Sequence, residues 1–297
     1  MRLGVNLPTV DIGGDPVVVR EYAQTAEDLG YDHLTLADHV LGVNIANLPD
    51  WGDRNTSEDY FHDPFVLFAY LSACTSKIEF NTGVLILPQR QTALVAKQCT
   101  SLDILSNQRF RFGVGIGWNK AEYIALNESF SNRGKRSVEQ IKVLKELWAQ
   151  KHVEIEGRWH QMSNIGINPL PKKKSIPLWI GGHQEVTLQR VAEYGDGWIM
   201  LAYGPGDKAQ DNFKLLREYV AKTGRRPEDV GIEVWTSSSG TPDSWRREIE
   251  FWQEAGVTHI CLNNSFSRYH HKPILDRSIS GHLAAMTKYR EAVADLL

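Results

Sequence analysis

The sequence is poor in the residues that define small secreted and metal-stapled proteins. Only 3 of its 297 residues are cysteine, and Cys74, Cys99 and Cys261 lie far apart with no C-x-x-C pair. This spacing excludes a disulfide framework and the common zinc and dithiol motifs, so we expect free thiols and a reducing, cytoplasmic compartment. The N-terminus lacks a signal-peptide pattern, and no apolar run approaches the roughly 18 residues of a membrane span.

An excess of charge of one sign is missing as well. Lysine and arginine together number 33 against 36 aspartate and glutamate residues, which gives a formal net charge of −3. Nucleic acids and anionic membranes attract basic surfaces, so neither is expected as a partner. The patterns H-E-x-x-H and G-x-S-x-G are absent, and no metal site is predicted. A small-molecule substrate is the expected partner.

The apolar residues that are present, 42% of the chain, suffice for a sizeable core. Short runs rich in β-branched residues alternate with longer segments of helical period, which indicates parallel βα units. Eight strands are predicted, at residues 3–7, 33–37, 78–87, 110–116, 178–180, 198–201, 230–235 and 257–262. A helix follows each of them, so the pattern predicts a (β/α)₈ TIM barrel formed by a single domain over residues 1–297. An open doubly wound sheet is the alternative.

Two insertions interrupt this rhythm. Residues 42–62 contain proline, glycine and several asparagines, and they are predicted to form a long loop. Loops of this length inside a compact domain tend to be functional or mobile. Residues 151–176 are predicted to contain a short hairpin around Gly157, followed by a stretch rich in proline and lysine.

Active sites of such barrels lie at the C-terminal ends of the strands, so the residues that follow each strand are the candidates. Asp38 and His39 follow the second strand, and a histidine can donate or accept a proton near neutral pH. Both are candidate catalytic residues, and the alternative is a pair that only bonds neighbouring loops. Thr82, Gly83 and Val84 lie in the third strand, where a glycine marks a bulge, a close approach to a ligand or a simple change of twist.

Glycines alternate along the fourth strand. Gly113, Gly115 and Gly117 leave one face of that strand without side chains, so a flat ring could approach the backbone there. Tight packing inside the barrel is the alternative explanation. Trp118 and Asn119 follow directly and are candidates for the substrate pocket.

Two further glycine motifs are typical of sites that bind a phosphate group. Gly181 and Gly182 end the fifth strand just before a predicted helix, whose N-terminal N–H groups and dipole attract anions. Gly197 and Trp198 begin the sixth strand, and barrels commonly place a phosphate site among their late loops. A turn without a ligand would explain either motif taken alone.

In combination, these motifs resemble the bacterial luciferase-like monooxygenase superfamily, and within it the oxidoreductases that use the deazaflavin coenzyme F420. The matching stretches span roughly residues 1–200 in order: LADHV (36–40), HDPF (62–65), TGVLILPQR (82–90), AKQ (96–98), LDILS (102–106), FGVGIGWN (112–119) and PLWIGG (177–182).

The resemblance implies a homodimeric barrel with insertions that binds F420 at the C-terminal ends of its strands. It implies a cis peptide bond between Gly83 and Val84, in a bulge that supports the cofactor ring, and it places the phosphate on Gly181 and Gly182. His39 would lie near the ring or the substrate as a proton donor or acceptor. The predicted cofactor-binding residues are Thr82, Gly83, Val84, Gly115, Gly117, Gly181, Gly182, Gly197 and Trp198.

The sequence also departs from the family pattern. Trp118 stands where some relatives carry a catalytic glutamate, and Val43 and Asn44 occupy the region where some carry a tryptophan. These departures argue against a sugar-phosphate or simple alcohol substrate, and they leave the substrate open. The alternative to an F420-dependent enzyme is a monooxygenase that uses reduced FMN and oxygen. A barrel that has lost its cofactor and only binds a partner is a third hypothesis.

Overall fold

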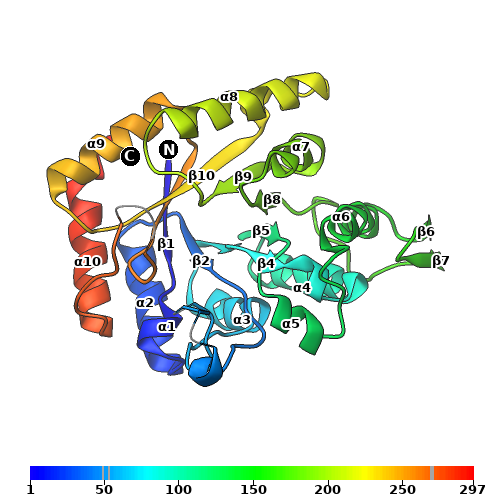
Figure 1. Cartoon of the computed structure of the whole chain (residues 1–297), viewed down its shortest axis with the longest axis horizontal. Coiled ribbons are helices and arrows are strands. Elements are labelled where there is room, and N and C mark those ends of the chain that lie inside the picture. Colours follow the sequence, from blue (N-terminus) through cyan, green and yellow to red (C-terminus); the bar gives the residue numbers. More distant parts are fainter. Residues whose placement is uncertain (49, 53, 268–270) are drawn as a thin grey trace.

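The computed structural model describes residues 1–48, 50–52, 54–267 and 271–297, and its strands form a closed parallel barrel (Figure 1). The strands of the barrel are β1 (Arg2–Asn6), β2 (His33–Leu36), β3 (Glu79–Thr82), β4 (Leu85–Ile86), β5 (Phe110–Gly115), β8 (Leu178–Gly181), β9 (Gly197–Met200), β10 (Gly231–Thr236) and β11 (His259–Leu262). Short β3 and β4 together take the third of eight positions, and the pairing of β3 with β5 closes the ring. The predicted TIM barrel is therefore confirmed, and the open sheet is excluded.

Helices surround the strands in Figure 1. The longer ones are α2 (Pro16–Asp28), α3 (Pro64–Cys74), α4 (Thr92–Leu105), α6 (Arg133–Ala149), α7 (Glu185–Tyr194), α8 (Asp207–Lys222), α9 (Pro242–Glu254) and α10 (Ile279–Ala292). The shorter ones are α1 (Thr9–Ile12), α5 (Lys120–Ala125), η1 (Ile45–Asn47), η2 (Leu87–Gln89), η3 (Pro227–Asp229) and η4 (Ala294–Leu296). None of the described helices is both long enough and apolar enough to cross a bilayer.

The third strand position contains a β-bulge. Asn81 lies opposite Arg111, and Leu85 lies opposite Val114, so four steps on one side face three on the other. One extra residue is thus accommodated between β3 and β4. The sequence predicted one continuous strand over 78–87; the structure divides it at the bulge.

The N-terminal half of the barrel interior is filled by large polar and aromatic side chains. Arg111 Nη2 lies 2.6 Å from Glu233 Oε2, and the guanidinium also stacks over Trp179 at 4.3 Å. The imidazole of His259 meets the indole of Trp179 edge-on, at 4.7 Å between centroids. Because this end of the barrel is packed, a ligand can enter only from the C-terminal ends of the strands.

The second insertion forms the predicted hairpin, from β6 (Val153–Glu156) and β7 (Gln161–Ile165), which projects beside α6 in Figure 1. Glu139 of α6 anchors its tip. The Oε1 atom of Glu139 accepts hydrogen bonds from Trp159 N and His160 Nδ1, both at 2.8 Å, and Oε2 accepts one from Arg158 N at 3.1 Å. In the first insertion, η1 and a bridge between Val43 and Thr56 are the regular structure among the described residues.

Candidate functional site

The bulge is fixed to β5 by a threonine side chain. The hydroxyl of Thr82 donates to Gly113 O at 2.7 Å and accepts from Gly113 N at 2.9 Å. The next peptide bond, between Gly83 and Val84, is cis, as the family resemblance implied. The Thr82 hydroxyl therefore fixes the bulge to β5 through both of its hydrogen bonds with Gly113.

The side chain of Val84 is the point where three strand ends meet. A Cβ atom on Gly115 would lie 2.6 Å from one Val84 methyl group, and a Cβ on Gly181 would lie 2.8 Å from the other. Both distances are shorter than real carbon contacts, so only glycine leaves room for Val84 at these positions. The face of β5 that the sequence predicted to be bare is thus covered by Val84 at Gly115. After the strand, Ile86 lies beside Gly117, where an added Cβ would lie 2.7 Å from Ile86 Cγ2.

The catalytic candidate His39 has a partner that the sequence did not predict. Its Nδ1 lies 3.2 Å from Oε2 of Glu122 in α5, and the Glu122 side chain is only 1% exposed. No described residue contacts Nε2 of His39 within hydrogen-bonding distance. A capping pattern could have revealed this glutamate, because Asn119 begins α5 and accepts a hydrogen bond from Glu122 N at 3.1 Å.

The second catalytic candidate, Asp38, is buried and bonded on both oxygens. Its Oδ1 accepts a hydrogen bond from Arg90 Nη2 at 2.7 Å, and its Oδ2 accepts one from Ile86 N at 3.0 Å. Burial raises the pKa of the Asp38 carboxyl against the opposing effect of Arg90. Asp38 thus ties the end of β2 to β4, and its catalytic role stays a prediction.

Aromatic side chains surround His39. Its ring centroid lies 5.0 Å from that of Phe61 and 6.2 Å from that of Trp118. Trp118 is 44% exposed and also contacts the first insertion, because the Trp51 ring lies 5.4 Å away and the Arg54 guanidinium 5.1 Å away. This position suits the predicted substrate pocket.

The second pocket candidate, Asn119, is 1% exposed and serves as the N-cap of α5. Its Nδ2 atom is buried without a hydrogen-bond partner and remains available as a donor.

The predicted phosphate end of the site lies at the N-terminus of α7. Gly182 has a φ of +133°, and an added Cβ would lie 3.0 Å from Thr187 Oγ1, so this turn requires glycine. The N-cap residue of α7, Gln184, makes no side-chain capping bond. The first N–H groups of the helix are therefore not satisfied by a cap.

Two arginines that the sequence analysis did not single out lie close to this helix. Arg133 Nε donates a hydrogen bond to Gly117 O at 3.3 Å. The next residue, Gly134, packs against Arg190 of α7: a Cβ atom added to Gly134 would lie 2.8 Å from Arg190 Nη2. Burial and the positive charge of Arg133 lower the pKa of Arg190. Among the described residues, neither guanidinium has a carboxylate within ion-pair distance. Two like charges held together without a counterion favour an anionic ligand.

Two predicted cofactor residues are placed away from the rim. Gly197 begins β9 in the filled half of the barrel, where an added Cβ would lie 2.4 Å from the Trp179 ring. Trp198 is fully buried and packs against Phe213, but its Nε1 donates to Gly182 O at 2.8 Å. Gly197 thus makes room for Trp179, and Trp198 holds the turn at Gly182; their contact with a cofactor stays a prediction.

A further donor that sequence reasoning missed is Trp235, near the end of β10. Its Cζ2 atom would lie 3.7 Å from a Cβ on Gly83, so the indole borders the bulge. Its Nε1 is buried and has no hydrogen-bond partner. Because β-strand aromatics are common in barrel cores, the sequence alone gave no reason to select this tryptophan.

Deeper in the barrel, potential ligand atoms of His33, Glu233 and Cys261 lie within 4.8 Å of one another. Arg111 already forms an ion pair with Glu233, with 2.6 Å between Nη2 and Oε2. A cation placed there would meet the positive charge of Arg111, so this group does not argue for a metal site.

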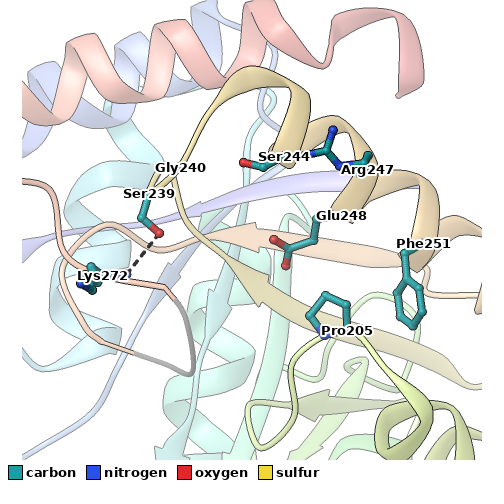
Figure 2. A pocket seen from close by; sticks show the side chains of 8 residues that line it. All are labelled: Pro205, Ser239, Gly240, Ser244, Arg247, Glu248, Phe251 and Lys272. Carbon is teal, nitrogen blue, oxygen red and sulfur yellow. Dashed lines mark hydrogen bonds between the residues drawn. The ribbon is translucent and has the colours of Figure 1, made fainter.

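Two cavities lie beside the rim. One, of about 700 Å³, lies between the loop after β9 and the start of α9, with the Glu248 carboxylate directed into it (Figure 2). The other, of about 360 Å³, lies between the N-terminus of α4 and the hairpin, and Arg136 and Gln140 of α6 line it.

Sequence comparison gives the family directly. The model of the luciferase-like monooxygenase family matches residues 1–272. The chain belongs to this family. An uncharacterised protein of Mycobacterium tuberculosis is 32% identical over 247 residues, which are 81% of this chain and 82% of that protein. The pyrimidine monooxygenase RutA of a Bradyrhizobium strain is 32% identical over 225 residues, 72% of this chain and 58% of the enzyme.

Solved structures share the fold. An F420-dependent secondary alcohol dehydrogenase, solved with an F420–acetone adduct, superposes with a TM-score of 0.76 over 98% of both chains. Its sequence is 19% identical to this one, so the likeness shows the architecture alone. Members of this family with a known activity are oxidoreductases, and this protein is a luciferase-like oxidoreductase or monooxygenase by family.

Proposed function

We propose that the protein transfers a hydride between coenzyme F420 and a small organic substrate at the C-terminal end of the barrel. The observation that carries this proposal is the convergence of the Gly83–Val84 bulge, Gly115 and Gly181 on one point, next to β2, the strand that His39 follows. When bound, the deazaflavin supplies the hydride chemistry, and the protein supplies orientation and electrostatics.

The residues around the bulge fit a flat cofactor ring. Val84 offers an apolar support that Gly115 and Gly181 hold in place. Trp235 Nε1 and Asn119 Nδ2 are buried donors without a partner, and such groups are costly unless a ligand or water satisfies them. Together these residues would orient the ring and exclude water from one of its faces.

His39 is the proposed proton donor or acceptor. Oxidation of an alcohol or reduction of a carbonyl by hydride transfer requires a proton to leave or reach the oxygen. His39 is 14% exposed, and its Nε2 is free of protein partners among the described residues. An imidazole with one nitrogen free of protein partners can exchange a proton with a substrate.

The proposed phosphate site consists of Gly181, Gly182 and the N-terminus of α7, with Arg133 and Arg190 nearby. The helix offers N–H groups that no side chain caps, and the two guanidinium groups have no counterion among the described residues. This combination of helix dipole and uncompensated positive charge matches a phosphate group.

Equilibrium titration with F420 and with FMN tests the proposal. We expect tight binding of F420, followed by its fluorescence, and weak or no binding of FMN. Binding of FMN without binding of F420 would contradict the proposal, and absence of binding by either would favour the non-catalytic hypothesis.

The alternative is a monooxygenase that uses reduced FMN and oxygen. The 32% identity to a pyrimidine monooxygenase over 225 residues favours this alternative. Both candidates use the same support and the same phosphate site, so the titration separates them. Oxygen consumption with reduced FMN would be the confirming assay for the monooxygenase.

We also infer a homodimer and a reducing, cytoplasmic compartment. Large apolar side chains are exposed on neighbouring helices, with Val66 of α3 at 67% and Val17 of α2 at 56%. Such side chains are candidates for a subunit interface. All three cysteines are free thiols, which suits a reducing compartment. Sedimentation velocity would show a monomer if the first inference is wrong.

A further inference from the structure

We propose that Glu122 is a positioning residue that fixes the tautomer of His39, with the proton on Nδ1 and the lone pair on Nε2. The proposal rests on the proposed function only in the use made of Nε2 during turnover. The tautomer itself is a property of the protein without any cofactor, and it can be measured as such.

The two oxygens of the carboxylate have separate tasks. Oε1 accepts hydrogen bonds from Val40 N at 2.6 Å and Leu41 N at 3.1 Å. Oε2 lies 3.2 Å from His39 Nδ1. One buried side chain from α5 thus holds three consecutive residues that lie more than 80 positions earlier in the chain.

The carboxylate keeps its charge in this setting. Burial alone would raise the pKa of Glu122, but the hydrogen bond and the charge interaction with His39 and the hydrogen bond from Leu41 N lower it below the ordinary value. An ionised carboxylate only accepts hydrogen bonds, so the nitrogen that faces it must carry a proton. In the neutral ring, Nδ1 of His39 is therefore the protonated nitrogen, and Nε2 is the acceptor.

The ring has little freedom to turn away from this arrangement. Phe61 lies against the His39 ring edge-on at 5.0 Å, and Trp118 does so at 6.2 Å. Asn119 fixes the first turn of α5 by capping Glu122 N, which holds the carboxylate at its place. A base whose second nitrogen is bonded to a carboxylate is held in one orientation and one tautomer.

The substitution Glu122→Gln tests the proposal, because it replaces one oxygen by an NH₂ group. The amide oxygen would still accept the hydrogen bonds from Val40 N and Leu41 N, and the NH₂ group would then face His39 Nδ1. A donor in that position favours the opposite tautomer, with the proton on Nε2. We expect ¹⁵N chemical shifts of histidine-labelled protein to show Nδ1–H in the wild type and Nε2–H in the variant.

The His39 signals are assigned by their loss in His39→Gln, since the chain has 10 histidines. Glu250→Gln, at an exposed position on α9, is the matched control and should leave the His39 signals unchanged. Nε2–H in the wild type, or the same tautomer in both proteins, would overturn the proposal. If Glu122→Gln does not fold, the wild-type spectrum alone still decides.

A kinetic readout follows where F420-dependent turnover is found. Glu122→Gln should then lower kcat on the order of 10³–10⁴-fold, the scale for a base held in the wrong tautomer, and leave F420 affinity within about threefold. Equal loss of turnover and affinity would indicate a structural role for Glu122. If the tautomer changes as expected but F420 does not bind, the proposed function fails and this assignment stands.

Discussion

At the scale of single residues, adjacent side chains at the end of β2 have opposite environments. The side chain of Asp38 is 1% exposed and hydrogen-bonded to Arg90, whereas the His39 ring lies beside the exposed Trp118. In the sequence, the place of this pair after a strand made both residues candidates. The sequence could not separate the two roles, because the partner of His39 is Glu122, which lies 83 positions away.

His39→Ala should lower turnover by about 10²–10⁴-fold, the usual contribution of a general acid or base, and should leave F420 affinity within about threefold. The reason is that the imidazole supplies a proton path while the bulge and the α7 turn supply cofactor binding. Parallel measurements of kcat and of the cofactor Kd check this. Equal losses in both would exclude an acid–base role.

At the scale of elements, Gly115 and Gly181 make room for the Val84 side chain in the bulge. The spacing Gly113, Gly115 and Gly117 was visible in the sequence, and so was the glycine in the third strand. The sequence could not predict that a methyl group of Val84 packs against Gly115. That contact depends on the extra residue between β3 and β4. The short helix α5 escaped prediction since six residues carry too little periodicity.

Gly115→Ala should weaken cofactor binding at least tenfold, because the new methyl would displace Val84 from a 2.6 Å approach. The overpacking should also lower the free energy of unfolding by about 1–3 kcal/mol. Gly231→Ala is the control: its methyl would meet Trp179 at 2.4 Å in the filled half of the barrel. That variant should lose stability but keep cofactor affinity, and a similar affinity loss in both would disprove the role of Val84.

Arg133→Gln should weaken the phosphate-bearing cofactor on the order of tenfold, because it removes one of two uncompensated positive charges near α7. Titration of the same variant with the dephosphorylated cofactor should show no change. Lys135→Gln, at an exposed position on the same helix, controls for net charge. Equal weakening of both ligands would place the phosphate elsewhere.

At the scale of the whole molecule, the order of strands and helices was predictable because each βα unit carries its own hydrophobic period. The closure of the barrel and the packing of its interior were not, since they join residues from opposite ends of the chain. His33 from β2 and His259 from β11 illustrate this: both lie in the filled half with Arg111.

This packing gives the stability a pH dependence. Burial and the charge of Arg111 lower the pKa of His33 well below its usual range and that of His259 to about 2. Both rings stay neutral in the folded state, whereas the unfolded chain takes up protons below about pH 6.5. The stabilisation is therefore complete above that pH and declines as the pH falls, by about 2 kcal/mol for His259 at pH 5.

Denaturant unfolding at pH 7 and pH 5 measures this decline. His259→Gln should reduce the decline by about 2 kcal/mol, while His152→Gln, at an exposed position, should leave it unchanged. A pH slope that is the same in His259→Gln and wild type would contradict the neutral buried state.

The central claim is that one end of the barrel holds a flat, phosphate-bearing cofactor, and a crystal structure of the F420 complex tests it most directly. We expect the ring against Val84, with His39 Nε2 directed towards the substrate side and the phosphate on Gly181 and Gly182 at the start of α7. A cofactor found in the cavity beside α9, or at the hairpin, would contradict it.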